Sequence, residues 1–144
     1  MKSGAGAIPI SLEVEDIGDN SSPMADAGED QELEIRASWQ PFSQSTDCPE
    51  LEFVLDATAS SDPNGDSLTY SWTETSGELS SNGGVIQDSN LAITTVTLPS
   101  RSPGTGTTNM TFELQVSDCV DSDSKTVSIS YSCINYNWKK NWNC

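Results

Sequence analysis

The sequence predicts an all-β protein folded as an antiparallel β-sandwich. Short segments in which apolar and polar residues alternate recur along the 144-residue chain, and that period of two is typical of half-buried strands. Clusters of Gly, Pro, Asn, Asp and Ser separate these segments, as turns require. No segment keeps a helical period over eight residues. The length suits one domain of ordinary size.

The first expected strand covers residues 8–14, and Pro9 inside it restricts that strand to a sheet edge. Residues 15–23 then form a polar linker. We expect three regions: residues 1–22 as strand and linker, 23–133 as the sandwich, and 134–144 as a tail. The apolar positions that define the first strand are Ile8, Ile10, Leu12 and Val14.

The sandwich itself is expected to begin near Ala25 with a β region that reaches Ile35. Residues 36–50 break the alternation and are interpreted as a loop-like insertion. Residues 51–57 alternate again, and a tight turn follows at 60–66. Leu68, Tyr70 and Trp72 then share one strand face.

The second half of the sandwich shows longer loops between its strands. Residues 76–90 are expected to be a loop with a short strand at Val85–Ile86, and the β-branched run 92–98 is expected to be a strand. After a loop at 99–109, clean alternation at 112–116 and again at 127–131 predicts the last two strands. An acidic turn at 118–123 joins them.

The charge balance excludes several classes of function. The chain has 22 acidic and 6 basic residues, no histidine and a net charge of -16. Nucleic acids and anionic lipid surfaces attract Lys and Arg clusters, so neither is an expected partner. Without histidine the usual general base and the Ser–His and Cys–His pairs are missing. No apolar run is long enough to insert in a membrane. We therefore do not expect an enzyme.

The four cysteines indicate the compartment. They lack C-x-x-C spacing, which favours two disulfides over a zinc site and therefore an extracellular or cell-surface location. The first residues contain no apolar stretch of signal-peptide length. We expect a mature or excised piece of a longer secreted protein.

Residues 23–133 resemble a PKD domain, the immunoglobulin-like module of many cell-surface proteins. The resemblance is carried, in the family's order, by ADAGEDQ at 25–31, LDATASSDPNGD at 55–66, LTYSW at 68–72 and FELQVSD at 112–118. It implies a two-sheet immunoglobulin-like sandwich with Trp72 between the sheets. It implies little about the ligand, because such domains act as spacers, adhesive surfaces and accessory modules.

In such a sandwich three acidic groups converge at one end, where the first strand starts and the turns 60–67 and 118–124 lie. Calcium takes six to eight oxygen ligands from flexible loops. Exposed turn residues without any ion remain the alternative. A catalytic carboxylate pair is a residual alternative, because no substrate groove is visible. The calcium candidates are Asp16, Asp19, Asp26, Asp30, Asp62, Asn64, Asp66, Asp118 and Asp121.

The same topology favours a Cys48–Cys133 disulfide, because the insertion and the end of the last strand lie together at the opposite end. Cys119 and Cys144 would then pair, with the tail climbing back along the sandwich. A local Cys133–Cys144 bond is the alternative.

Two functions from different classes suit this chain. The first is a non-catalytic structural or adhesive module that contacts protein or glycan at a cell surface. The second is a module that targets a secreted hydrolase to polysaccharide or collagen, because flat aromatic rings stack on such surfaces. A packed tail with no binding role is the plainer interpretation of these aromatic residues. The candidate contact residues are Trp39, Tyr136, Trp138 and Trp142.

Residues 8–14 leave a further choice open. This apolar strand can pair with its own sandwich, belong to a preceding domain, or add to a neighbouring copy and build a filament. The base rate of tandem sandwich modules favours the first two.

Overall fold

The computed structural model describes residues 6, 18–40, 45–77, 79–104 and 106–135. These residues form two facing sheets and a small hairpin, with no helix among them. The four-stranded sheet has the order β1 (Gln31–Arg36), β9 (Ser122–Ile134), β8 (Thr107–Ser117) and β5 (Thr69–Ser76). The three-stranded sheet has the order β4 (Leu51–Asp56), β7 (Ile93–Leu98) and β6 (Val85–Ile86). The hairpin consists of β2 (Ser38–Gln40) and β3 (Ser45–Asp47).

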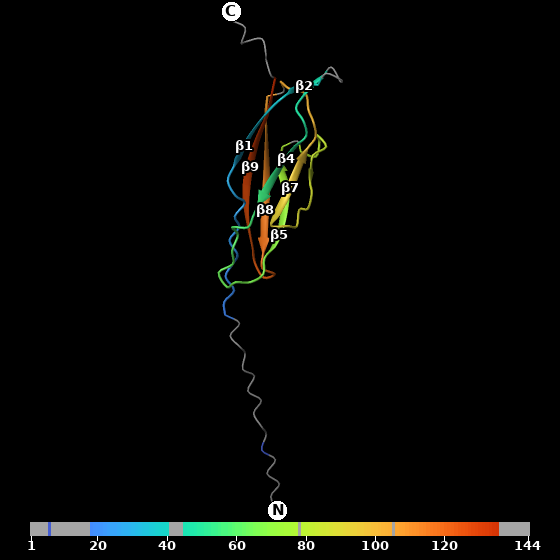
Figure 1. Cartoon of the computed structure of the whole chain (residues 1–144). Helices are drawn as coiled ribbons and strands as arrows, with labels where there is room; N and C mark the ends of the chain where they lie inside the picture. Colours follow the sequence, from blue (N-terminus) through green and yellow to red (C-terminus); the bar gives the residue numbers. More distant parts are fainter. Residues whose placement is uncertain (1–5, 7–17, 41–44, 78, 105, 136–144) are drawn as a thin grey trace, which may run out of the picture.

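The strands give the molecule two distinct ends. β8 and β9 form a long antiparallel hairpin, and β1 runs parallel to β9. The β8–β9 turn lies at the end where the described chain begins, and β9 finishes at the opposite end, beside β2 (Figure 1). We call the first end the acidic pole and the second the distal pole.

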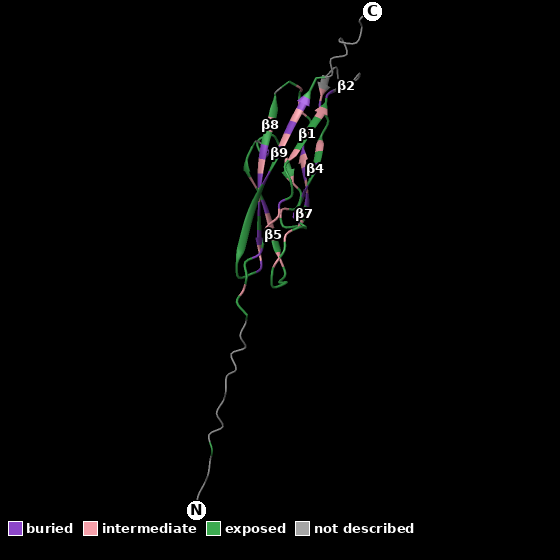
Figure 2. Cartoon of the chain, turned by 90° about the vertical axis from the view of Figure 1, so that its left-hand side faces the viewer, coloured by how far each residue is buried: buried purple, intermediate pink, exposed green. Residues whose placement is uncertain are grey.

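Alternating side chains from both sheets form one buried cluster. Buried and exposed residues alternate along several strands in Figure 2. Phe53 from one sheet meets Phe112 from the other edge to face, with ring centroids 5.9 Å apart. Trp72 is buried, and its Nε1 donates to the carbonyl of Leu91 at 3.1 Å. A buried indole therefore keeps its hydrogen bond, as its polar atom requires.

The structure confirms the predicted all-β immunoglobulin-like class and corrects several boundaries. Residues 25–30 are not a strand, because Gly28 takes a left-handed backbone (φ 76) and β1 begins only at Gln31. The insertion 36–50 is not a plain loop, since it contains the β2–β3 hairpin. β8 begins at Thr107 and β9 at Ser122, so the expected loop and turn are shorter. Backbone pairing extends these strands through Ser- and Thr-rich sequence that carries no alternation.

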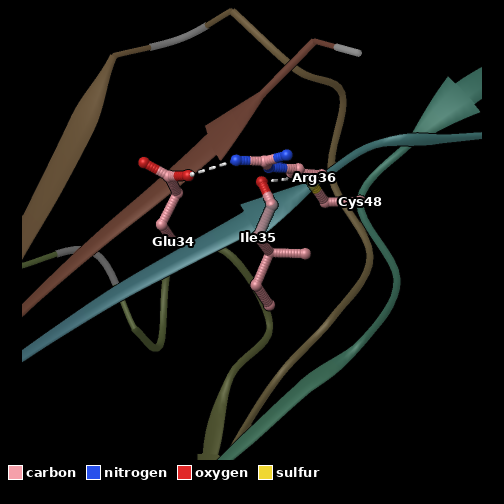
Figure 3. Close-up of polar contacts among 4 residues, drawn as sticks. All are labelled: Glu34, Ile35, Arg36 and Cys48. Carbon is pink, nitrogen blue, oxygen red and sulfur yellow. Dashed lines mark hydrogen bonds and ion pairs between the residues drawn. The ribbon is translucent and has the colours of Figure 1, made fainter.

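The predicted Cys48–Cys133 disulfide is present, with the two Cα atoms 6.0 Å apart. It excludes the alternative Cys133–Cys144 bond. Figure 3 shows Cys48 beneath the end of β1, where its sulfur lies 3.5 Å from the carbonyl oxygen of Ile35. A bonded sulfur carries no hydrogen, so this is a packing contact. Above it, Arg36 and Glu34 form an exposed ion pair at 3.7 Å.

Candidate functional site

Three carboxylates meet at the acidic pole. Asp62, Asp66 and Asp118 each offer an oxygen, and these oxygens lie within 4.8 Å of one another. The 62–66 turn brings the first two together, because Oδ1 of Asp62 accepts the amide of Asp66 at 3.0 Å. Gly65, with a φ of 81, permits the left-handed backbone that this tight turn needs. The turn between β8 and β9 supplies the third carboxylate.

Asp118 is held as a carboxylate by its hydrogen bonds. Its side chain accepts the backbone amides of Asp121 at 2.7 Å and Val120 at 2.8 Å. Its second oxygen accepts the Asn20 amide at 3.0 Å. The pKa of Asp118 is lowered chiefly by the Asp121 amide, then by Asn20 and Val120. The site is therefore negatively charged at neutral pH.

Asp62 has an unused oxygen. Its Oδ2 is buried and has no hydrogen-bond partner, while its Oδ1 caps the turn. A buried carboxylate oxygen without a donor is unfavourable, and a cation would satisfy it. Hard oxygen ligands from two loops are the donor set that calcium prefers. The arrangement therefore fits calcium.

Some of the remaining calcium candidates lie at the acidic pole, and others form hydrogen bonds elsewhere. Oδ2 of Asp121 accepts the same Asn20 amide at 3.1 Å, and Oδ1 of Asn64 accepts the backbone amide of Ser21 at 2.8 Å. Both therefore lie at the acidic pole. The side chain of Asp26 accepts a hydrogen bond from the Gly28 amide, and the side chain of Asp30 accepts one from the Ser128 amide on β9. Asp19 is exposed, and Asp16 lies outside the described residues.

Asn20 is the residue that sequence reasoning missed. Its amide links Asp118 to Asp121 and so ties the linker to the turn between β8 and β9. An amide beside acids in the linker was the only available signal, and linkers commonly contain Asn.

The predicted aromatic contact surface lies mostly outside the described residues, which exclude Tyr136, Trp138 and Trp142. Trp39 contributes its backbone to β2. The described surface instead exposes aliphatic side chains on the outer face of the three-stranded sheet. Val54, Ile93 and Val85 are 47%, 51% and 52% exposed there. The alternation of residues 51–57 places Val54 on the outward face, and Val54 is an apolar residue at that position.

A small cavity near the distal pole offers no substrate groove. Its volume is about 80 Å³, and Tyr131 and Arg101 contribute to its lining. That space suits a few water molecules. The guanidinium of Arg101 lies 5.4 Å from the Tyr131 ring centroid. Burial raises the pKa of Tyr131, while Arg101 opposes that rise.

Two facing sheets with Trp72 packed between them define an immunoglobulin-like domain. The K319L-like PKD domain family matches residues 43–131, more than half of the chain. The chain therefore belongs to that family. PKD domains are commonly extracellular, typically non-catalytic, and generally mediate protein–protein contact.

Solved structures agree on the fold. The PKD domain of human KIAA0319 is 16% identical with a TM-score of 0.50, and the match covers 82% of this chain and 88% of that one. A nucleoside hydrolase-related hypothetical protein from Saccharophagus degradans, described as associated with carbohydrate metabolism, is 22% identical with a TM-score of 0.52. This second match covers 79% of the present chain and only 26% of the Saccharophagus protein.

A comparison with curated proteins gives no match. Within the part of the chain that the structure describes, no helix has the length and apolar character needed to cross a membrane.

Proposed function

We propose that this chain is a non-catalytic, extracellular structural module that mediates protein–protein contact at a cell surface. One observation carries this proposal beyond the family match. Val54, Val85 and Ile93 are exposed together on the outer face of the three-stranded sheet. An apolar patch exposed on a sheet face marks a surface that binds a partner.

A bead assay tests the proposal. Beads coated with the full chain should aggregate, and a Val54→Asp/Ile93→Asp variant should weaken that aggregation by placing charge on the contact face. Glu52→Gln on the same face of β4 is the matched control and should aggregate normally. If beads coated with the wild-type chain stay dispersed, contact between copies is not the function.

The alternative is substrate targeting through the aromatic tail. Its support is the composition of residues 134–144, which include Tyr136, Trp138 and Trp142. Retention on insoluble chitin, cellulose or collagen that disappears in Trp138→Ala/Trp142→Ala would favour this alternative. Equal elution of wild type and variant would reject it.

We further propose that calcium binds at the acidic pole and stiffens the linker junction. The support is the buried, unpartnered Oδ2 of Asp62 within the cluster of three carboxylates. A ligand of the native state must stabilise that state by mass action. Millimolar calcium should therefore raise the melting temperature relative to chelator, and Asp66→Asn should reduce the rise. Identical melting curves with calcium and chelator would rule the site out.

A further inference from the structure

We infer that residues 8–14 of one copy add as an antiparallel strand to the free edge of β4 in the next copy, joining copies head to tail. This inference rests on the proposed contact function and names its partner, a second copy of this chain. The apolar strand Ile8, Ile10, Leu12 and Val14 lies outside the described residues. The acceptor edge, by contrast, is fully described.

Two of the four outer strands are poor acceptors. The middle of β5 is already engaged, because the backbone amide of Trp72 donates to the Ser89 carbonyl at 2.8 Å. β6 has only two residues, Val85 and Ile86, too few for a stable ladder. β1 and β4 remain, each with six residues, at the ends of their sheets.

The hydrogen bonds around β4 show which of its groups are free for a new strand. Ala57 donates to the Ala92 carbonyl, so in this antiparallel register the odd-numbered residues of β4 bond to β7. The backbone groups of the even-numbered residues therefore point to the open edge. The Val54 carbonyl accordingly points to this edge, where the side chain of Gln31 donates to it at 3.1 Å. An added strand would replace that side-chain hydrogen bond.

Chain direction favours β4 over β1. Asn20 is fastened to the acidic pole through Asp118 and Asp121, so a strand formed by residues 8–14 would have to extend from that pole. A strand reaching the distal pole of the next copy would place residue 14 near that pole and residue 8 deeper along the sandwich. β4 starts beside Cys48 at the distal pole and runs the opposite way, whereas β1 runs the same way. Antiparallel pairing is slightly more stable per residue, so β4 is the better acceptor.

The edge of the chain's own sandwich is a poorer partner. A strand that folded back from Asn20 onto its own β4 would run parallel to it. The lower part of that side is also filled by residues 24–27, since Met24 pairs with Ser61 and the Asp26 amide donates to Ser60. Addition to the next copy avoids the parallel pairing. Residues 24–27 occupy the same place in every copy, so the added strand would lie against the distal half of β4.

Burial supports a strand at this position. Leu33 and Ile35 on β1 and Leu51 on β4 pack against the core but are only partly buried. The core is therefore incompletely covered on the side where β1 and β4 lie. An added strand with four aligned apolar side chains would cover it, while the alternate residues Ser11 and Glu13 would face water. Head-to-tail repetition of such a contact gives an open filament.

Two full-length variants test the inference by mixing. Ile10→Asp spoils the donor strand but leaves β4 intact. Val54→Pro removes an outward-facing amide from β4 without touching its bonds to β7, and leaves the donor intact. Each variant alone should be monomeric in light scattering, whereas an equimolar mixture should form heterodimers that grow no further. Ser11→Asp and Val54→Thr, the matched controls, should assemble like wild type.

Several results would overturn the inference. A monomeric wild-type chain at high concentration, assembly of Ile10→Asp, or a mixture that stays monomeric would each do so. Melting curves identify a Val54→Pro chain that has not folded, and Glu52→Pro then replaces it. If beads coated with wild type and beads coated with Ile10→Asp aggregate equally, the contact function is kept. The proposed addition of residues 8–14 to β4 is then rejected.

Discussion

Trp72 connects a sequence pattern to a packed core. The alternation at residues 68–72 places this ring between the sheets, and the Leu91 carbonyl then completes its hydrogen bonding. Replacing it removes ring volume and leaves that carbonyl without its donor. We predict that Trp72→Phe lowers the free energy of unfolding by about 2 kcal/mol. Chemical denaturation measures this loss. Val120→Ala, at a side chain that is 72% exposed, is the control and should change stability by less than about 0.5 kcal/mol.

Acidic side chains at the turns determine the response to pH. Hydrogen bonds lower the pKa of Asp118, through the Asp121 amide above all, and lower that of Asp56, through the Thr58 hydroxyl above all. A carboxyl with a lowered pKa in the folded state contributes stability above its unfolded pKa of about 4. That contribution is lost as pH falls through the folded value. Melting temperatures measured in chelator should therefore fall below about pH 4, and the fall should be shallower in Asp118→Asn. An unchanged slope in that variant would contradict the assignment.

At the scale of elements, the disulfide fastens the insertion to the last strand. It joins positions 85 residues apart and therefore restricts a long loop of the unfolded chain. We predict that Cys48→Ala/Cys133→Ala loses about 2–4 kcal/mol of stability while the sandwich core persists. Near-ultraviolet circular dichroism and denaturation measure both effects. Cys119→Ser, at an exposed thiol, should leave stability unchanged.

The strand lengths also bear on Cys119 and Cys144. β9 alone has 13 residues and spans about 40 Å at a strand's rise. The ten residues after Ile134 reach at most about 36 Å. Because Cys119 lies beyond the start of β9, the tail is too short to reach it comfortably within one chain. We predict that this pair bonds between successive copies in assembled material. A non-reducing gel should show a ladder that Cys144→Ser abolishes. A Cys119–Cys144 peptide from strictly monomeric protein would contradict the prediction.

For the whole molecule, the alternation of apolar and polar residues predicted most of the strands in the two sheets but not where each strand begins and ends. Alternation marked β4, β5 and the centres of β8 and β9, because one face of each is buried. Alternation did not predict β2 and β3, because backbone pairing holds them without an apolar pattern. It also did not show that residues 25–30 lie outside the strand and that β1 begins only at Gln31. The topology of the resembled sandwich predicted that Asp62, Asp66 and Asp118 lie at one end. The link from Asn20 to Asp118 depends on a contact 98 residues away in sequence, so no local signal carried it.

The proposed assembly depends on two unlike poles of the whole molecule. Asn20 is held at the acidic pole, and β4 starts near the distal pole. Direct imaging of the concentrated wild-type chain by electron microscopy is the measurement that tests this most directly. We expect unbranched filaments of end-to-end sandwiches from the wild-type chain, and none after Ile10→Asp. Dispersed single particles from the wild-type chain, or closed rings, would contradict it.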